Sequence, residues 1–315
     1  MSASAADRRI RALRPPKAEF DAWRAHGSLV EEERRPGGRI ERALTIFLRG
    51  AECPFTCSFC DLWQWTLDGP TPVGALPRQM GDVLRSLDGP APERLKLYNA
   101  SNFFDRRAVP PRDLPAIARL ADGFAGVTVE SHARTVGGGA LAFAALLEGR
   151  LEVAVGLETV HPGAAARLNK RLDLAHFDAA ARYLRDNGIE LRAFVLLGAP
   201  HVPAAESVEW TVRSAQHAVE QGATLVSIIA VRGGNGELER LRALGHFAPP
   251  TLAQLEAALE CCAGIGPTVV TADLWDAGRL PACALCRDAR LDRLRRLNLT
   301  GLPQAAVVCQ LCSPS

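Results

Sequence analysis

Three cysteines stand close together in the segment Glu52-Cys-Pro-Phe-Thr-Cys-Ser-Phe-Cys-Asp61, at C-x3-C-x2-C spacing. Three thiolates on one short loop suit an iron–sulfur cluster. A [4Fe-4S] cube held by protein alone takes four cysteine ligands, so a loop that offers only Cys53, Cys57 and Cys60 leaves one iron open for another ligand. A zinc site completed by a residue elsewhere in the chain is the alternative for these three thiols.

A second group of cysteines lies near the C-terminal end as two C-x2-C pairs, namely Cys283 with Cys286 and Cys309 with Cys312. The spacing approximates a four-cysteine zinc site, in which each pair supplies two thiolates, and it fits an auxiliary iron–sulfur cluster equally well. The segment 287–299 between the pairs is basic and has the apolar spacing of a helix. The two remaining cysteines, Cys261 and Cys262, lie in another helical pattern and are interpreted as small hydrophobic residues.

The elements that must position the first loop repeat as strand and helix from residue 41 onward, which predicts parallel strands with crossover helices. The predicted strands are 43–48, 94–98, 126–130, 151–158, 190–197 and 224–231, with 268–271 as a last short strand. The predicted helices are 77–87, 112–121, 139–147, 174–187, 204–221 and 251–263. Six units are too few for a closed eight-stranded barrel. We therefore predict an α/β fold, an open (β/α)6 partial TIM barrel with a small C-terminal Cys-rich metal-binding module.

This pattern predicts three regions. Residues 1–40 read as a peripheral N-terminal extension with a short helix at 18–25, residues 41–275 as the barrel core, and residues 276–315 as the four-cysteine metal-binding module. Within the core, Asp173 is expected to cap the helix at 174–187, and Thr251 with Gln254 is expected to form a capping box.

Polar side chains stand where successive predicted strands end. In a barrel of parallel strands the carboxyl ends build the active site, so these residues are expected to meet the three-cysteine loop. The candidates are Asn99, Ser101, Asn102, Glu130, Arg134, Glu158 and Arg232.

The three-cysteine segment resembles the signature of the radical S-adenosyl-L-methionine (radical SAM) family. Ser131–Arg134, Gly156–Thr159 and Leu168–Lys170 extend the resemblance toward the branch with the elongator-type and archaeosine-synthesis tRNA-modifying enzymes, over about residues 40–275. The resemblance implies the open (β/α)6 barrel and a [4Fe-4S] cluster on Cys53, Cys57 and Cys60. It also implies SAM on the open iron, and reductive cleavage of SAM to a 5′-deoxyadenosyl radical that takes hydrogen from a substrate.

SAM has chemical groups that need different partners. Asn99, Ser101 and Asn102 occupy the place where the family often carries a Gly-Gly-Glu-like motif, and they are the candidates for the amino group. Arg134 is the candidate for the carboxylate, because a guanidinium pairs with it in a bidentate manner. Glu130 and Glu158 are expected at the ribose. Phe59 and the last two long strands are expected at the adenine, and Arg232 completes the set of cofactor-binding candidates.

Composition restricts the partners and the compartment. The formal net charge is +2 over 315 residues, so no strong bulk attraction to an acidic partner is implied. Six Arg and two Asp in 279–315 indicate either a nucleic-acid footprint or a solvated helix face. No secretory signal and no apolar run of membrane-spanning length is found, so no membrane partner is expected. Metal-type cysteine spacing favours a reducing compartment, the cytoplasm. An electron donor such as flavodoxin or ferredoxin is expected.

Three hypotheses about function follow. The first is a radical SAM enzyme that acts on a modified base or nucleoside, with tRNA as the candidate carrier. The second is a radical SAM enzyme that acts on a peptide or a small metabolite. The third is a zinc-stabilised nucleic-acid-binding protein without catalysis, which leaves the three-cysteine loop unexplained.

Overall fold

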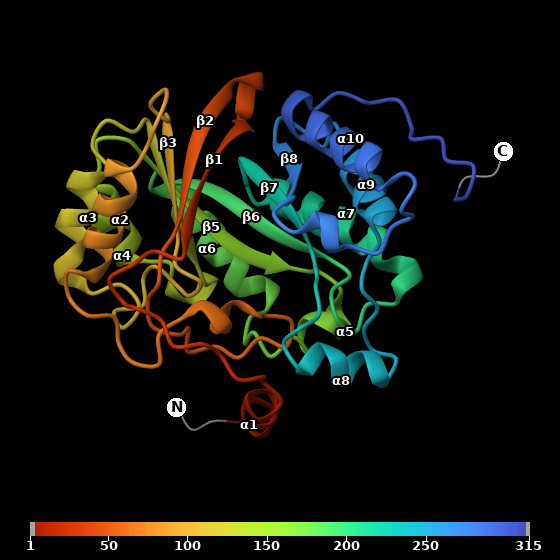
Figure 1. Ribbon diagram of the computed structural model, residues 1–315, viewed down its shortest axis with the longest axis horizontal. Coiled ribbons are helices and arrows are strands. Elements are labelled where there is room, and N and C mark those ends of the chain that lie inside the picture. The colour runs from red at the N-terminus through yellow and green to blue at the C-terminus, as the bar shows by residue number, and fades with distance from the viewer. Residues whose placement is uncertain (1–3, 313–315) are drawn as a thin grey trace.

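The computed structural model describes residues 4–312, in which eight strands form one curled sheet in sequence order, with helices along its outer face (Figure 1). The strands are β1 (Gly27–Arg34), β2 (Ile40–Phe47), β3 (Arg94–Tyr98), β4 (Gly126–Ser131), β5 (Arg150–Glu158), β6 (Glu190–Leu197), β7 (Leu225–Ala230) and β8 (Val269–Ala272). Strands β2 to β8 are parallel, and β1 pairs antiparallel with β2. The predicted partial barrel is confirmed, with the short last strand present.

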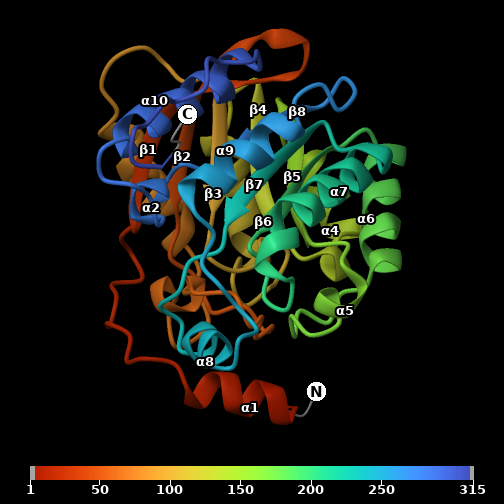
Figure 2. The ribbon, with the colours of Figure 1, turned by 90° about the vertical axis from the view of Figure 1, so that its right-hand side faces the viewer.

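Most of the helices cover the outer face of the sheet, and the others lie at its carboxyl end or over the seam between its edge strands (Figures 1 and 2). The helices are α1 (Ala5–Ala12), α2 (Ala75–Arg85), α3 (Leu114–Leu120), α4 (Gly138–Ala144), α5 (Pro162–Ala165), α6 (Leu174–Asp186), α7 (Ser207–Glu220), α8 (Glu237–Ala243), α9 (Leu252–Cys261) and α10 (Arg287–Thr300). The predicted caps are confirmed: Asp173 accepts the backbone N–H of His176 at the start of α6, and Thr251 forms a capping box with Gln254 at α9. None of the helices among the described residues is long and apolar enough to cross a membrane.

The interior of the barrel is charged near the amino ends of the strands. Arg192 binds Glu33 of β1 at 2.6 Å and Glu152 of β5 at 2.8 Å, and all three side chains are buried. The same network includes Arg35, Glu41, Arg94 and Lys96. Because each buried charge has opposite charges beside it, these groups fill this end of the barrel without stranded ions. The open end for chemistry is therefore the other one.

Helix α10 covers the seam between the two edge strands, β1 and β8, which do not pair with each other (Figure 2). Asn298 of α10 accepts from the backbone N–H of Ala272 and donates to its carbonyl, both at 2.8 Å, as a neighbouring strand would. Leu294 and Leu297, two of the apolar positions of α10, are buried. This helix thus replaces the missing strand pairing.

The N-terminal 40 residues are not peripheral. Residues 27–34 form β1, an edge strand of the main sheet, and α1 packs at the carboxyl end of the barrel, next to α8 (Figures 1 and 2). The predicted helix at 18–25 is wrong, because this stretch is irregular and turns. Its aromatic residues Phe20 and Trp23 lie against arginines instead, with Arg49 over Phe20 and Arg78 over Trp23.

Candidate functional site

The three-cysteine loop begins six residues after β2 and crosses the carboxyl end of the barrel, its mouth. Its thiols are half-buried and unoxidised. The backbone of the loop is fixed at two points: Ser58 N–H donates to the carbonyl of Leu168 at 2.8 Å, and the Asn235 amide donates to the carbonyls of Ser58 and Cys60 at 2.9 and 3.2 Å. The loop is therefore held between the segments that follow β5 and β7.

Asp7 of α1 braces the same loop from outside. Its buried carboxylate accepts hydrogen bonds from the Thr56 hydroxyl and from the Asn169 amide, and it pairs with Arg171. The hydrogen bonds hold the pKa of Asp7 well below its usual range, although burial opposes this. Sequence reasoning missed Asp7, and the only signal for it was the Ser4-x-x-Asp7 capping box, which predicts a helix and not its position.

The three thiols lie where thiolates are unfavourable without a nearby cation. Burial raises the pKa of Cys53 to about 11 and that of Cys60 to about 12, and it raises the pKa of Cys57 too. Lys170 is the nearby cation that partly opposes this effect at Cys57. A positively charged iron–sulfur core would provide the missing compensation, so the donor set fits such a group.

Lys170 and Glu158 form a buried ion pair beside the loop. The Lys170 ammonium also donates to the carbonyl of Gly156, and both side chains are less than a tenth exposed. A Cβ at Gly156 would stand 2.1 Å from the Glu158 carboxylate and 2.3 Å from the Lys170 nitrogen, so only glycine leaves room for the pair. Glu158 itself has a φ of 69°. Backbone of this kind persists only where the surroundings impose it, and it clusters at functional sites.

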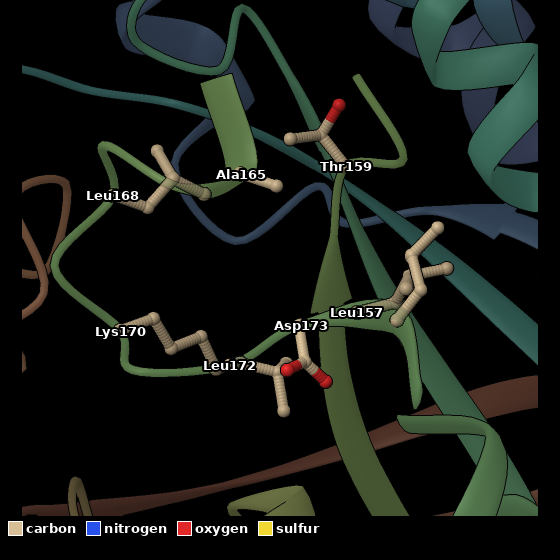
Figure 3. A pocket seen from close by; sticks show the side chains of 8 residues that line it. Leu157, Thr159, Ala165, Leu168, Lys170, Leu172 and Asp173 are labelled. Carbon is tan, nitrogen blue, oxygen red and sulfur yellow. The ribbon is translucent and has the colours of Figure 1, made fainter. Parts of the chain in front are cut away.

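The segment that carries Lys170 faces the end of β5 across a small cavity of about 10 Å³ (Figure 3). Leu157 and Thr159 line it from the strand side, with Leu168 and Leu172 opposite. The two residues on either side of Lys170, numbers 169 and 171, also have positive φ values, 53° and 57°. The sequence singled out Leu168–Lys170 as part of a resemblance, but it did not identify Lys170 as a site residue.

Asn99, at the end of β3, is the clearest open binding group. Its side chain is fully buried, yet neither its Oδ1 nor its Nδ2 has a hydrogen-bond partner among the described residues. The Ser101 hydroxyl is also without a partner there. Buried polar atoms in native proteins are normally satisfied, so these atoms fit a polar ligand such as the amino group of SAM.

Glu130 supports this segment from β4. Its carboxylate accepts the backbone N–H of Asn99 at 2.8 Å and further backbone N–H groups of Ala100 and Ser101. Burial raises the pKa of Glu130 to about 7, although these hydrogen bonds to its carboxylate lower the pKa in part. Ala100 has a φ of 53°, so the carboxylate secures a strained turn. In this structure Glu130 thus positions the Asn99 segment.

Asn102 and Arg134 have other neighbours. The Asn102 amide donates to Thr135 at 2.8 Å, and its oxygen accepts from Ser131 and from the backbone of Phe104, so its polar atoms are satisfied within the protein. Arg134 is exposed and bonds His176 at 2.9 Å, on the outer side of the mouth. The cations that the structure brings near the cysteines are Lys170, near Cys53 and Cys57, and Arg14, near Cys60.

Phe59 and Arg232 lie on the β6–β7 side of the mouth. Phe59 packs against an apolar cluster with Leu196 and Val231, which provides the flat apolar wall expected for an adenine. Arg232 pairs with Asp276 at 3.4 Å. Burial raises the pKa of the nearby Asp61, and the positive charge of Arg232 partly opposes this shift.

An aromatic pair lies at the end of β2. Phe47, the last residue of that strand, and Trp275 have ring centroids 4.8 Å apart, and Trp275 is 55% exposed. A large aromatic face therefore remains open to solvent near the mouth.

The four tail cysteines lie together next to the start of α10, which Cys286 directly precedes. The sulfur atoms of Cys283 and Cys309 are 3.9 Å apart, those of Cys286 and Cys312 are 3.5 Å apart, and all four lie within 4.8 Å of one another. Backbone N–H groups of Leu311 and Cys312 donate to Cys309 and lower its pKa to about 6. The predicted convergence of the two pairs into one possible metal site is confirmed.

The arginines of the tail are bound within the protein. Arg290 and Arg293 both pair with the buried Glu256 of α9, and Arg293 also reaches Glu260. Arg287 donates to the carbonyls of Gly278 and Leu280, and Arg295 pairs with Asp292. The local positive charge of 279–315 is thus largely engaged in internal contacts, which weakens its interpretation as a nucleic-acid footprint.

Comparisons with known proteins agree with this architecture. No protein-family model matches the sequence, and no curated protein matches it either. Among solved structures, archaeal Elp3 from Methanocaldococcus infernus, with residues 1–46 deleted, superposes with a TM-score of 0.52 at 13% identity. The match covers 71% of this chain and 59% of that chain, so this chain spans less than two thirds of it.

A radical SAM methyltransferase from Sphaerobacter thermophilus superposes with a TM-score of 0.50 at 15% identity, over 83% of this chain and 77% of that chain. Methylornithine synthase (PylB) has a TM-score of 0.46 and 13% identity, over 82% of each chain. The structural neighbours of this chain thus include radical SAM enzymes. At this level of identity the likeness establishes the shared fold, a radical SAM partial TIM barrel.

Proposed function

We propose that this chain is a radical SAM enzyme, with a [4Fe-4S] cluster on Cys53, Cys57 and Cys60 and SAM on the open iron. One observation carries the proposal. Three half-buried thiols cross the carboxyl end of a parallel barrel, and at the same end Asn99 follows β3 with a buried amide that has no partner among the described residues. An incomplete set of thiolates next to an unsatisfied polar group is the arrangement that a cluster with an exchangeable ligand needs.

Each side of the mouth has its own role in this proposal. Asn99 and Ser101 hold the amino group of SAM, and Glu130 fixes the backbone that presents them. Lys170, kept in place by Glu158, supplies positive charge next to the thiolates and the SAM carboxylate. Phe59 provides an apolar wall for the adenine.

Three further contacts with SAM stay predictions, namely those of Asn102, Arg134 and Arg232. The geometry favours Lys170 over Arg134 at the carboxylate, because Arg134 is exposed and bonds His176 on the outer side of the mouth.

When bound, the cluster would pass one electron from an external donor to the sulfonium of SAM, so that a C5′–S bond breaks to methionine and a 5′-deoxyadenosyl radical that takes a hydrogen atom from the substrate. The chain's own task is to orient and to exclude water. The loop is held by Asn235 and braced by Asp7, and the charged network closes the opposite end of the barrel. Residues 41–275 are proposed as this catalytic core, with 276–315 as the metal-binding module.

We propose a modified base or nucleoside as the substrate, with tRNA as its carrier. The supporting observation is the Phe47–Trp275 pair at the mouth, because aromatic faces stack on bases. The internal pairing of the tail arginines means that the tail does not add to this argument. A peptide or small metabolite is the alternative substrate class. A flavodoxin or ferredoxin type of donor and a cytoplasmic location are part of the proposal, in line with nine free cysteines.

Anaerobic reconstitution with iron and sulfide tests the activity. We expect the visible absorption of an iron–sulfur cluster and, under reduction with dithionite, formation of 5′-deoxyadenosine and methionine from SAM in equal amounts. The Cys261→Ser variant is the matched control, because this exposed cysteine lies outside both cysteine groups. Absence of a cluster would contradict the proposal and favour a non-catalytic zinc protein. A cluster that leaves SAM intact would contradict radical SAM activity.

The substrate class is tested separately, by binding to bulk tRNA across a salt series with the reconstituted protein. Binding that weakens with rising salt, and that also weakens in Trp275→Ala, is expected if a base stacks at the mouth while phosphates are held nearby. No binding, or binding that the Trp275 substitution leaves unchanged, would count against a base in tRNA. It would favour the peptide or metabolite alternative.

A further inference from the structure

The tail cysteines converge too closely for a multinuclear cluster. In a [4Fe-4S] cube each thiolate binds its own iron, and in a two-iron cluster each pair binds a different iron, so the sulfurs must spread around several metal ions. On one tetrahedral ion with metal–sulfur bonds of about 2.3 Å, the sulfurs are about 3.8 Å apart. The observed 3.5 and 3.9 Å, and the limit of 4.8 Å for all four atoms, match one ion.

The surroundings of these sulfurs complete a closed site. Arg290 donates from its Nε to Cys286 at 3.3 Å and from a terminal nitrogen to Cys312 at 3.7 Å. The same guanidinium pairs with Glu256 of α9. Hydrogen bonds to sulfur spread the negative charge that four thiolates bring to a divalent ion. Four protein ligands leave no open position, which is the mark of a structural zinc site and not of a catalytic one.

The position of this site explains what it would hold. Cys286 is the residue that precedes α10, and Cys309 and Cys312 lie on the segment that returns after Gly301 ends the helix. Between these points Asn298 pairs with the edge of β8. The ligands thus lie on both sides of the helix in the chain.

Helix α10 fits the β1–β8 seam closely. Arg34 of β1 donates to the carbonyls of Asn298 and Val270 at 3.2 and 3.5 Å. Gly301 has a φ of 63°, and a Cβ there would stand 2.3 Å from the Arg34 guanidinium. A shift of the helix would therefore disturb contacts with both edge strands.

We propose that one zinc ion on Cys283, Cys286, Cys309 and Cys312 clamps α10 across the seam between β1 and β8. The ion ties the start of the helix to the returning tail, and the helix closes the side of the barrel that strand pairing leaves open. The clamp does not depend on the radical chemistry proposed for the mouth, and its test does not require activity.

The first measurement is metal content of anaerobically purified full-length protein. We expect about one zinc per chain in the wild type, in Cys261→Ser and in the triple variant Cys53→Ser/Cys57→Ser/Cys60→Ser, whereas Cys309→Ser/Cys312→Ser loses zinc. If the triple variant bound iron instead, the tail site would be an iron site and the assignment of zinc would be wrong. A triple variant that binds no metal would overturn the site altogether. Removal of zinc from the wild type by a chelator supplies the same comparison without a variant that fails to fold.

The second measurement is hydrogen exchange of the zinc-loaded and chelator-treated wild type. Loss of zinc should speed exchange about tenfold or more in α10 and at β8, while the central strands β4 and β5 keep their protection. Asn298→Ala should speed exchange at β8 and leave the zinc content unchanged, because it removes the seam contact without touching a ligand. Unchanged exchange at α10 and β8 after zinc removal would overturn the clamp.

Discussion

The two cysteine groups of this chain differ in completeness and in surroundings. The mouth loop brings three thiols to the carboxyl end of the barrel, the end at which Asn99 follows β3 with polar atoms that have no partner among the described residues. The tail brings four sulfurs within 4.8 Å, and no other group of three or more potential metal ligands in residues 4–312 converges in this way. In our proposals, the open set of three cysteines serves chemistry and the closed set of four serves structure.

Their supports differ in the same sense. The mouth loop is fixed through its backbone by Asn235 and through the Thr56 hydroxyl by Asp7. Two of the tail sulfurs, those of Cys286 and Cys312, accept hydrogen bonds directly from Arg290. Four sulfurs can complete the coordination of one ion at the tail, whereas the three at the mouth would leave a position for another ligand.

The largest expected effect comes from removing the open set. The triple variant Cys53→Ser/Cys57→Ser/Cys60→Ser should lose all 5′-deoxyadenosine formation, because no iron remains to bind SAM. Its zinc content and its thermal unfolding midpoint should stay close to those of Cys261→Ser, because the four tail cysteines are unchanged. Product assays and calorimetry on the same preparations check both statements. SAM cleavage by this variant above the reagent blank would show that Cys53, Cys57 and Cys60 do not hold the cluster that cleaves SAM.

Removing the closed set should reverse this pattern. Cys309→Ser/Cys312→Ser should lower the Tm by roughly 10 °C, because the metal contributes folding free energy. The iron content of the mouth loop and 5′-deoxyadenosine formation per folded chain, measured below the transition, should remain. If this variant kept its Tm but lost activity, the tail would belong to the chemistry and the distinction between the two groups would fail.

A smaller effect separates two asparagines at the end of β3. Asn99→Leu should weaken SAM binding about 10- to 100-fold, because a hydrogen bond to a charged group is lost, while the free energy of unfolding of the apoprotein stays level or rises. Asn102→Leu should instead destabilise by about 1–3 kcal/mol, since three hydrogen bonds to Ser131, Phe104 and Thr135 lose their partner. Equilibrium SAM binding and urea unfolding measure the pair. Equal effects of both substitutions on SAM binding would show that Asn99 has no special contact with the cofactor.

Much of this arrangement was predictable from the sequence. The parts that were not predictable share one cause. Apolar runs such as Leu44–Leu48 and Leu191–Leu197 predict strands of the central sheet, because these strands bury apolar side chains on their outer face. Strand β1 was missed because its sequence Gly-Ser-Leu-Val-Glu-Glu-Glu-Arg has no apolar alternation. Glu33 faces the barrel interior, where it meets Lys96 and Arg192. Those partners come from distant strands, so no local pattern could have indicated that burial.

The site was predictable to the same degree. The three loop cysteines were predicted as candidates from their residue type and spacing, and Asn99 from its place at the end of a predicted strand. Lys170 and Asp7 were not, because their importance arises from neighbours more than ten residues away in the chain, Glu158 for the one and Thr56 and Asn169 for the other. Tail convergence was predictable, but the number of metal ions was not, since it depends on distances between sulfur atoms.

An effect of similar size to those of the two asparagines concerns pH. The pKa of Glu130 is about 7 in the folded protein and about 4.5 in an unfolded chain, so between these values the folded state holds a proton that the unfolded state has released. Stability from this group therefore falls as pH rises from about 4.5 to 7, by on the order of 2–3 kcal/mol. Glu130→Gln should remove this fall in the apoprotein, as measured by urea unfolding at about pH 5 and about pH 7.5. The same difference between the two pH values in both proteins would show that Glu130 does not carry it.

The most direct test of an open iron at the mouth is electron paramagnetic resonance of the reduced protein with and without SAM. SAM should change the g-values of the reduced [4Fe-4S] signal in the wild type and in Cys309→Ser/Cys312→Ser alike, because the ligand binds at the loop of Cys53, Cys57 and Cys60 and not at the tail. A cluster signal that SAM leaves unaltered in the wild type, or one that persists in the triple loop variant, would contradict the account.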